Sequence, residues 1–280
     1  MSVELPEAYI LAKQMDQELV GKQVAHFSLQ NCAKYQDLGF FNLYLSDYER
    51  LCGCRIESVG SRGNTIKIKF DDELNLLLAP EYGGIVLFHR EGDVVPSKYH
   101  FRLSFTDETS LTVGLTGMGI IQAHTDDELQ QSYLYKRDFS SVASPIEDDD
   151  FTFERFSKEL SEKGVNLKTA IVGKNAVIVG LGNAAFQDIL FQAGINPKRK
   201  ASELSVKELG SLFKAIKYVV EQRINSGGKN QFVDFYGNHG NYIPAMGPNM
   251  KGKVCTKCGS NIEKLSIGGG QVYFCANCQK

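Results

Sequence analysis

The spacing of apolar residues near the start of the chain predicts an amphipathic helix over residues 6–20. Its apolar side chains recur every three or four residues and share one face: Ala8, Leu11, Ala12, Met15 and Leu19. Pro6 suits the first turn of a helix, and Gly21 follows the last apolar residue as a stop signal. The chain therefore opens with a helix that has one face to bury.

From about residue 22 to residue 124 the apolar period changes to two, which is typical of strands. Apolar and polar side chains alternate over residues 65–70, 101–105 and 111–115. Pairs such as Gly-Asn, Gly-Gly and Asp-Glu separate these segments as turn signals. Many short alternating strands favour an antiparallel sandwich or barrel.

A proline followed by four acidic residues marks residues 144–150 as a linker. Beyond it the pattern is helical in three segments: residues 151–163, 184–193 and 206–226. The last of these has the strongest start signal, because Ser205 and Glu208 form a capping box. Residues 229–252 are rich in Gly, Asn and Pro and are predicted to form a loop. The fold class is therefore α+β, with a helix and β-sandwich first and a helical part second.

Composition places this chain of 280 residues among ordinary globular proteins, with 42% hydrophobic and 23% charged residues. This balance excludes disorder as the dominant state. No apolar run approaches the roughly 18 residues that span a bilayer. The first residues lack the basic and apolar segments of a secretory signal. We therefore expect a cytoplasmic protein.

Charge is divided unevenly along the chain. Residues 1–150 carry 13 Lys and Arg against 24 Asp and Glu, a net charge of −11, whereas residues 151–280 carry 18 and 9, a net charge of +9. The basic half is the better candidate for contact with a polyanion such as a nucleic acid. The alternative is that both sets of charges only solvate two surfaces.

Two Cys-x-x-Cys pairs near the C-terminus predict a structural zinc site. Cys255 and Cys258 are separated from Cys275 and Cys278 by 16 residues, enough for a hairpin that brings two tight turns together. Four thiolates close a tetrahedral coordination sphere, so the zinc is structural rather than catalytic. Without a metal, this short tail would have almost no core. The remaining cysteines are interpreted as ordinary semi-buried thiols: Cys32, Cys52 and Cys54.

Residues 179–184 join two helical stretches through Gly180 and Gly182, which permit a tight turn. The helix that follows exposes backbone N–H groups at its start, a ready phosphate site, to which Asn183 adds a side-chain amide. Taken alone this pattern is often only a packing turn. A basic half and a zinc ribbon in the same chain favour the phosphate-binding interpretation.

These motifs together resemble the formamidopyrimidine-DNA glycosylase / endonuclease VIII family. The resemblance rests on Glu4-Leu5-Pro6-Glu7, on Gly180-Leu181-Gly182-Asn183 continuing to Pro197, and on the ribbon that ends Tyr273-Phe274-Cys275-Ala276-Asn277-Cys278-Gln279. It implies a β-sandwich domain, a helix–two-turn–helix domain and a zinc ribbon, with DNA bound between the halves. The segments expected from it are residues 1–143, linker 144–150, 151–250 and 251–280.

The resemblance also implies a chemistry. Members of the family flip a damaged base out of the duplex and cleave its glycosidic bond. Their N-terminal amine attacks C1′, a Schiff base forms, β-elimination cuts the strand, and an adjacent glutamate shuttles protons. Aligning the shared motif places Val3 where the family has its nucleophilic proline. The candidate catalytic residues are then Ser2, whose amine is free once Met1 is removed, with Val3, Glu4 and Glu7. The alternative role of both acids is to stabilise the helix start.

Several DNA contacts of the family fall on changed residues in this chain. The family's Arg-Gly-Lys motif is Arg62, a glycine and Asn64 here, so a lysine that contacts phosphate near the lesion is replaced. The intercalating methionine falls near Tyr82, whose ring still suits a wedge. No arginine lies in residues 114–119, and Gly270 replaces the arginine five residues before the third ribbon cysteine. Each lost cation weakens phosphate binding and its dependence on salt.

Other basic residues are candidates to compensate. Lys168 precedes the glycine turn, Lys198 follows its helix, and Lys264 lies in the ribbon. Lysines usually form a solvated face, but these share a domain with the phosphate-binding turn. We therefore predict DNA contacts from them and from Asn183, and nucleoid association of the protein when it is bound to DNA.

Three functions are compatible with the sequence. The first is a damaged-base DNA glycosylase of base-excision repair, with or without AP lyase activity, acting on double-stranded DNA with a damaged or abasic site. Its nucleophile is either the Ser2 amine or a water activated by Glu4. The second is a catalytically impaired relative that binds such DNA without cleaving it. The third discards the N-terminal match and leaves a zinc-ribbon nucleic-acid adaptor. The retained scaffold favours the enzyme.

Overall fold

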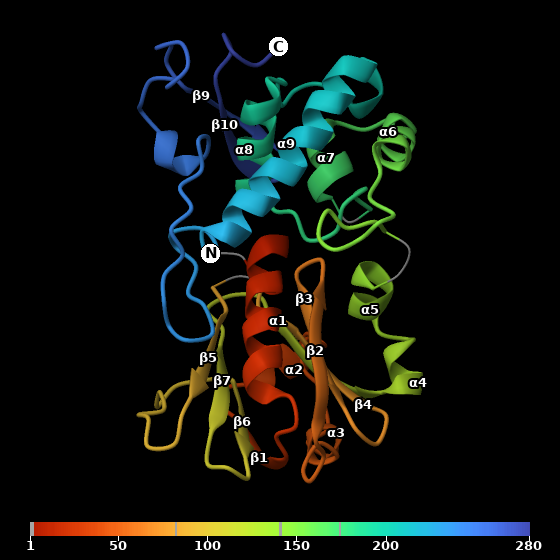
Figure 1. Cartoon of the computed structure of the whole chain (residues 1–280), viewed down its shortest axis with the longest axis vertical. Coiled ribbons are helices and arrows are strands. Elements are labelled where there is room, and N and C mark those ends of the chain that lie inside the picture. Colours follow the sequence, from red (N-terminus) through yellow and green to blue (C-terminus); the bar gives the residue numbers. More distant parts are fainter. Residues whose placement is uncertain (1–2, 82, 140–141, 174) are drawn as a thin grey trace. The chain divides into compact units, whose positions relative to one another are not determined.

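The computed structural model describes residues 3–81, 83–139, 142–173 and 175–280. The chain divides into two compact units, drawn together in Figure 1: Met1–Ser140 with Ser226–Asn241, and Ser141–Asn225 with Tyr242–Lys280. The segment Ser226–Asn241 thus packs with the N-terminal unit although it follows a helix of the second. The four segments expected from the sequence stay a prediction. None of the helices in the described ranges is long and apolar enough to cross a membrane.

Two four-stranded antiparallel sheets form the first unit. One has the order β1-β6-β7-β5 and the other the order β2-β3-β4-β8. Their bounds are β1 Val24–Leu29, β2 Ile56–Arg62, β3 Thr65–Phe70, β4 Leu74–Ala79, β5 Ile85–His89, β6 Phe101–Phe105, β7 Ser110–Gly114 and β8 Ile120–Thr125. Inward-facing residues of both sheets share one hydrophobic core. The predicted antiparallel architecture is confirmed, and it is a sandwich rather than a closed barrel.

The first helix, α1 (Leu5–Leu19), contributes its apolar face to the same core. It begins one residue earlier than its predicted start. In Figure 1 it lies between the strands of the two sheets. Because Leu11, Met15 and Leu19 are fully buried against the strands, the first turn of α1 is held firmly in place.

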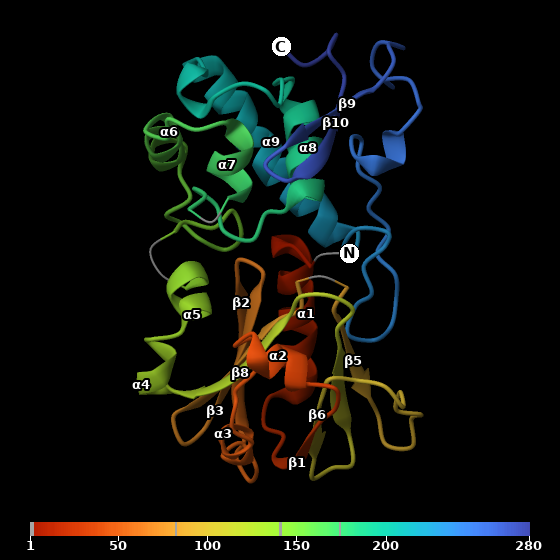
Figure 2. The same cartoon turned by 180° about the vertical axis from the view of Figure 1, so that it is seen from behind.

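Strand β4 departs from the alternation that the rest of the sheet follows, because all six of its residues are buried. Leu76 and Leu78 face the central core, whereas Leu77 packs with Leu129 and Leu134 on the outer face. Those two residues belong to the short helices α4 (Asp126–Leu129) and α5 (Tyr133–Asp138), which lie beside this sheet in Figure 2. Neither helix was predicted from the sequence, because four to six residues are too few to display a helical period.

The same reason explains two further short helices of this unit that were not predicted, α2 (Ala33–Asp37) and α3 (Ser46–Glu49). The segment Ser226–Asn241 is anchored by aromatic packing, since the ring of Phe235 lies 5.5 Å from that of Phe88 in β5. Phe232 and Phe235 are both buried in the central core. The segment is therefore held against the sandwich.

The second unit is helical, as predicted. Its helices are α6 (Phe153–Ser161), α7 (Leu167–Val172), α8 (Asn183–Ala193) and α9 (Val206–Asn225), with a 3-10 turn at Ala201–Glu203. Gly194 ends α8 in the left-handed conformation, with φ 72°. The predicted capping box starts α9, because the Glu208 N–H donates to Ser205 Oγ at 3.3 Å and the Ser205 N–H donates to Glu208 Oε2 at 2.8 Å. Only α7 was not predicted.

The C-terminal hairpin of this unit consists of β9 (Glu263–Ile267) and β10 (Gly270–Phe274), paired in antiparallel register. Ahead of it, residues 229–252 form the predicted loop, which contains a 3-10 turn at Pro248–Met250 and an isolated β-bridge between Val233 and His239. Phe191 of α8 packs with Met246, Tyr273 and the buried ribbon cysteines. This contact places the hairpin against α8.

Candidate active site, metal centre and nucleic-acid contacts

The start of α1 buries two carboxyl groups side by side. Glu4 is the N-cap of α1 and forms a capping box with Glu7, in which the Glu4 N–H donates to Glu7 Oε2 at 3.2 Å. Both acids are buried. Val3 is also buried, and its N–H donates to the carbonyl oxygen of Glu81 at 3.0 Å. The structure thus brings Val3, Glu4 and Glu7 together, whereas Ser2 lies outside the described residues.

Glu7 has a basic partner that the sequence analysis did not single out. The backbone N–H of Lys229 donates to Glu7 Oε1 at 3.2 Å, and its ammonium Nζ lies 4.0 Å from Glu7 Oε2. Lys229 is only 7% exposed. Its segment is fixed by Gln14, which donates to Asp234 Oδ2 at 2.9 Å and accepts the Phe235 N–H at 3.0 Å.

The sequence held one signal for this lysine. Lys229 is the sole Lys or Arg between residues 224 and 250, and it follows Gly227 and Gly228 directly. Both glycines have positive φ, and a Cβ at Gly228 would lie 2.5 Å from the Phe232 ring. Only glycine fits there, so the chain turns sharply out of α9 and delivers Lys229 to Glu7.

Helix α5 places a second cation, Arg137, beside the β2–β3 hairpin. Asn64 accepts a hydrogen bond from Arg137 Nη2 at 2.9 Å, and Arg137 Nη1 lies 3.3 Å from Glu81 Oε1. Burial opposes the charge of Arg137, but its bonds to Asp138 and Glu81 outweigh burial and raise its pKa. Arg62 is half-buried at the end of β2. The predicted substitution of a lysine by Asn64 thus leaves a guanidinium at that position, contributed by α5.

Tyr82, the predicted wedge, lies outside the described residues. Arg137 and Glu81 escaped the sequence analysis because they are distant in sequence from Asn64 and carry no local motif. Their arrangement follows only from the packing of α5 on the sheet.

In the second unit, three predicted residues meet where α7, α8 and the ribbon hairpin converge. Lys168 Nζ donates to the carbonyl oxygen of Ile267 at 2.6 Å, and Asn183 Nδ2 donates to that of Gln271 at 2.8 Å. A Cβ on Gly270 would lie 2.8 Å from Lys168 Nζ and 3.8 Å from the Asn183 amide. The lysine ammonium therefore occupies the space beside the residue that replaces the family's arginine.

Burial lowers the pKa of Lys168. Asn183 Oδ1 is buried and accepts no hydrogen bond in the described structure. Lys198 and Lys264 are exposed, and among the described residues their side chains make no hydrogen bond or ion pair with this group. The structure thus unites Lys168, Asn183 and Gly270 and leaves Lys198 and Lys264 as separate surface charges.

The four ribbon cysteines form a cluster whose geometry suits one metal ion. Cys255 Sγ lies 3.8 Å from Cys278 Sγ, and Cys258 Sγ lies 3.5 Å from Cys275 Sγ. All four sulfur atoms lie within 4.8 Å of one another. Tetrahedral zinc with Zn–S bonds of about 2.3 Å requires sulfur atoms about 3.8 Å apart, and disulfides require about 2.05 Å. The cluster therefore fits a tetrahedral ion rather than two disulfides.

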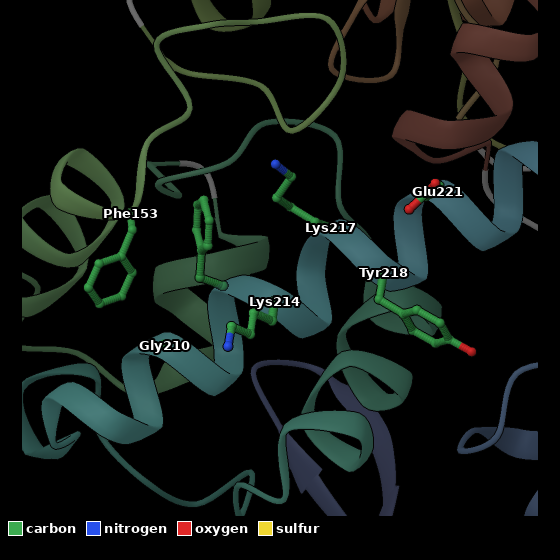
Figure 3. A pocket seen from close by; sticks show the side chains of 7 residues that line it. Phe153, Gly210, Lys214, Lys217, Tyr218 and Glu221 are labelled. Atoms are coloured by element: carbon green, nitrogen blue, oxygen red, sulfur yellow. The ribbon is translucent and has the colours of Figure 1, made fainter.

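A separate groove of about 560 Å³ lies along α9 (Figure 3). Its walls come from one stripe of the helix, including Gly210, Lys214, Lys217 and Tyr218, and from Phe153 of α6. None of the catalytic or binding residues predicted from the sequence lines it. The described residues predicted to be catalytic or to bind metal therefore lie elsewhere, at the start of α1 and in the ribbon.

Two models of known protein families match this chain. The sequence model described as formamidopyrimidine-DNA glycosylase N-terminal domain matches residues 3–114. A second sequence model, described as formamidopyrimidine-DNA glycosylase H2TH domain, matches residues 143–233. The two matches cover well over half of the chain.

The chain belongs to the formamidopyrimidine-DNA glycosylase / endonuclease VIII family.

Curated members of this family align along nearly the whole chain. The formamidopyrimidine-DNA glycosylase of Bacillus licheniformis is 29% identical over 241 residues, covering 82% of this chain and 83% of that protein. The enzyme of the same name from Cytobacillus firmus is 28% identical over 288 residues, covering 99% of both.

Solved structures of the glycosylase family share the fold. A Lactococcus lactis formamidopyrimidine-DNA glycosylase in complex with DNA containing an abasic site superposes with a TM-score of 0.85 over 99% of both chains, at 20% identity. Another complex of the Lactococcus lactis glycosylase, with DNA containing N7-benzyl-Fapy-dG, gives the same score and identity. The fold of this chain is thus the glycosylase fold.

Proposed function

We propose that this chain is a DNA glycosylase of base-excision repair that removes a damaged base and then cuts the strand as an AP lyase. The observation that carries the proposal is the pair of buried carboxyl groups, Glu4 and Glu7, at the first turn of α1 in a chain that matches the glycosylase N-terminal domain. Buried acids beside an amine suit proton transfer during covalent catalysis.

In the proposed reaction an amine attacks C1′ of the damaged nucleotide and the base leaves with a proton. The resulting Schiff base acidifies C2′, and loss of that proton breaks the C3′–O3′ bond. Glu4 is the proposed proton carrier. The amine predicted from the sequence is that of Ser2, which is free once Met1 is removed. Val3 contributes only a peptide N–H, which donates to the carbonyl oxygen of Glu81.

The proposed partner is double-stranded DNA with a damaged or abasic site. The Lactococcus lactis relative is seen in a complex with DNA that contains an abasic site. In this chain the basic half carries Lys168 and Asn183 beside the ribbon turn, a combination that suits a phosphate group. We assign the exposed Lys198 and Lys264 to further backbone contacts.

The proposed metal is one zinc ion held by Cys255, Cys258, Cys275 and Cys278. The spacing of their sulfur atoms supports this assignment. Four protein ligands leave no open position, so the ion supplies folding energy to the ribbon and takes no part in the reaction.

A second candidate function is a catalytically impaired relative that binds damaged DNA without cleaving it. The burial of Val3 and the engagement of its N–H favour this alternative, because the family's nucleophile position is then a closed peptide link. The replacements at Asn64 and Gly270 weaken phosphate contacts in the same direction.

A panel of duplexes separates the two candidates. The untagged protein is incubated in excess with duplexes that each carry one lesion, an oxidised purine, a ring-opened purine, an oxidised pyrimidine or an abasic site. We expect base release from at least one damaged duplex and strand cleavage at the abasic site. Tight binding to a lesion with no product from any duplex would overturn the enzyme and support the binder.

The ribbon turn gives a testable gain of function. Gly270→Arg restores a cation beside Lys168, and its Cβ displaces only the flexible end of that lysine. We expect the affinity for abasic duplex to rise about 3- to 10-fold. The slope of log affinity against log salt concentration should become steeper by about one. Fluorescence anisotropy at several salt concentrations measures both.

Ser266→Arg is the matched control, because it adds the same charge at an exposed position of the same hairpin. Equal tightening by both variants would mean that ribbon charge alone matters. An unchanged slope in Gly270→Arg would remove residue 270 from the DNA contacts.

A further inference from the structure

Lys229 presents a primary amine to the same pair of acids that the proposed function uses. Its Nζ lies 4.0 Å from Glu7 Oε2, and Glu7 in turn accepts the N–H of Glu4 at 3.2 Å. All three residues belong to one compact unit. We propose that Lys229 is the nucleophile that forms the Schiff base, a role that rests on the proposed lyase function and that neither the motifs nor the family match assigns.

The N-terminal segment has no amine at the position of the family's nucleophile. The residue aligned with the family's nucleophile is Val3, whose nitrogen is a peptide nitrogen bonded to the Glu81 carbonyl oxygen at 3.0 Å. A peptide nitrogen cannot form an imine with a sugar aldehyde. An amine from another residue must therefore reach the reacting carbon. The sequence offers that of Ser2, which lies outside the described residues, and within the described ranges Lys229 places its amine beside Glu7.

Lys229 is buried, which is unusual for a lysine. Lysine is rarely buried unless it is paired, and most lysines keep their ammonium group in water. Here Lys229 is 7% exposed, its backbone N–H donates to Glu7 Oε1, and its ammonium forms a long ion pair with Glu7 Oε2 at 4.0 Å. A buried lysine whose backbone and charge both face one acid is restricted in position, which is what a reacting group requires.

The segment that carries Lys229 is anchored to α1 and to the core. Asp234 and Phe235 are both bonded to Gln14 of α1, and Phe232 and Phe235 are buried in the core. Glu7 and Gln14 lie on the same helix, so one rigid element sets both the acid and the loop that delivers the amine. The amine and its acid are thus preorganised together.

The step balances without any further reactant. Glu7 takes a proton from the Lys229 ammonium, and the neutral Nζ attacks the C1′ aldehyde of the ring-opened abasic sugar. The new N–C bond forms as Glu7 returns its proton to the carbonyl oxygen, which leaves as water and gives a protonated imine. The Glu7 carboxylate, ionised again, then takes a C2′ proton, and the electron pair released from that C–H bond expels the 3′ phosphate oxygen, which cuts the strand. Hydrolysis of the imine then frees Lys229.

A simpler role for Lys229 is only to neutralise Glu7. Lys229→Arg separates the two roles, because arginine keeps the positive charge and does not form a Schiff base. If Lys229 only balances charge, the arginine variant retains its lyase activity. If Lys229 is the nucleophile, the variant binds DNA and fails to react.

The experiment is borohydride trapping of the full-length protein on a duplex with one abasic site, followed by peptide mapping of the adduct. We expect the sugar remnant on the peptide that contains Lys229. Lys229→Arg should reduce trapping at least about 100-fold while its melting temperature and abasic-DNA affinity stay close to wild type. Lys13→Arg, an exposed lysine of α1, is the control and should trap normally.

The outcomes separate the role of Lys229 from the lyase function itself. An adduct on Ser2, with normal trapping by Lys229→Arg, overturns the role of Lys229 and leaves the lyase intact. No adduct in the wild-type protein overturns the lyase itself together with this inference. Because the map of the wild-type adduct is read directly, the test stands even if Lys229→Arg folds poorly.

Discussion

Cys258→Ser is expected to release the zinc and unfold the ribbon. The hairpin β9–β10 has only two strands, and an isolated two-stranded hairpin is marginally stable in water. Structural zinc supplies about 10–16 kcal/mol to small zinc-binding peptides, as much as the whole stability of a typical domain. Because Cys255 and Cys275 are buried against Phe191, losing the ion also exposes that core.

Zinc content per chain, thermal unfolding and abasic-duplex affinity measure this effect together. We expect less than one zinc per chain, an earlier unfolding transition and binding at least about 10-fold weaker, since the ribbon turn carries phosphate contacts. Cys52→Ser is the matched control, because Cys52 is exposed and outside the cluster. Unchanged zinc content and DNA binding in Cys258→Ser would refute the zinc ribbon.

Glu4→Gln is expected to abolish most base release while leaving DNA binding unchanged. Glutamine keeps the oxygen with which Glu4 caps α1, so the helix start is retained. It loses the ability to accept and return a proton, which is worth about 10²–10⁴-fold in rate. Single-turnover kinetics on the duplex identified by the lesion panel measure the loss directly.

Glu57→Gln provides the control for the change from acid to amide, because Glu57 is an exposed residue of β2. It should react at the wild-type rate. A Glu4→Gln protein as fast as the wild type would mean that Glu4 only caps the helix, as its second interpretation holds.

Elements with a long local pattern were predictable from the sequence. Residues only a few positions apart determine the apolar face of α1, the capping box of α9 and the cysteine pairs. Such features can therefore be recognised in a short stretch of sequence. The short helices α4 and α5 have no such period. They form because Leu129 and Leu134 cover the outer face of β4, which is a tertiary effect.

The candidate site divides in the same way. Glu4 and Glu7 were found from a four-residue motif, but Lys229 lies 222 residues from Glu7. Lys168 was noticed as a charge, yet its contact with the ribbon turn joins residues 99 positions apart. Arg137 meets Asn64 across 73 positions. Spacing in the sequence carries no information on such meetings, which arise only when the chain is packed.

Borohydride trapping of the untagged wild-type protein tests directly whether this chain is a base-excision glycosylase with lyase chemistry. Its N-terminus is verified by intact mass, and abasic duplex is compared with undamaged duplex. We expect a covalent adduct on the abasic duplex alone. Tight binding to the abasic duplex with no adduct would contradict the lyase and, with no base release from the lesion panel, would make the protein a reader of damage rather than an enzyme.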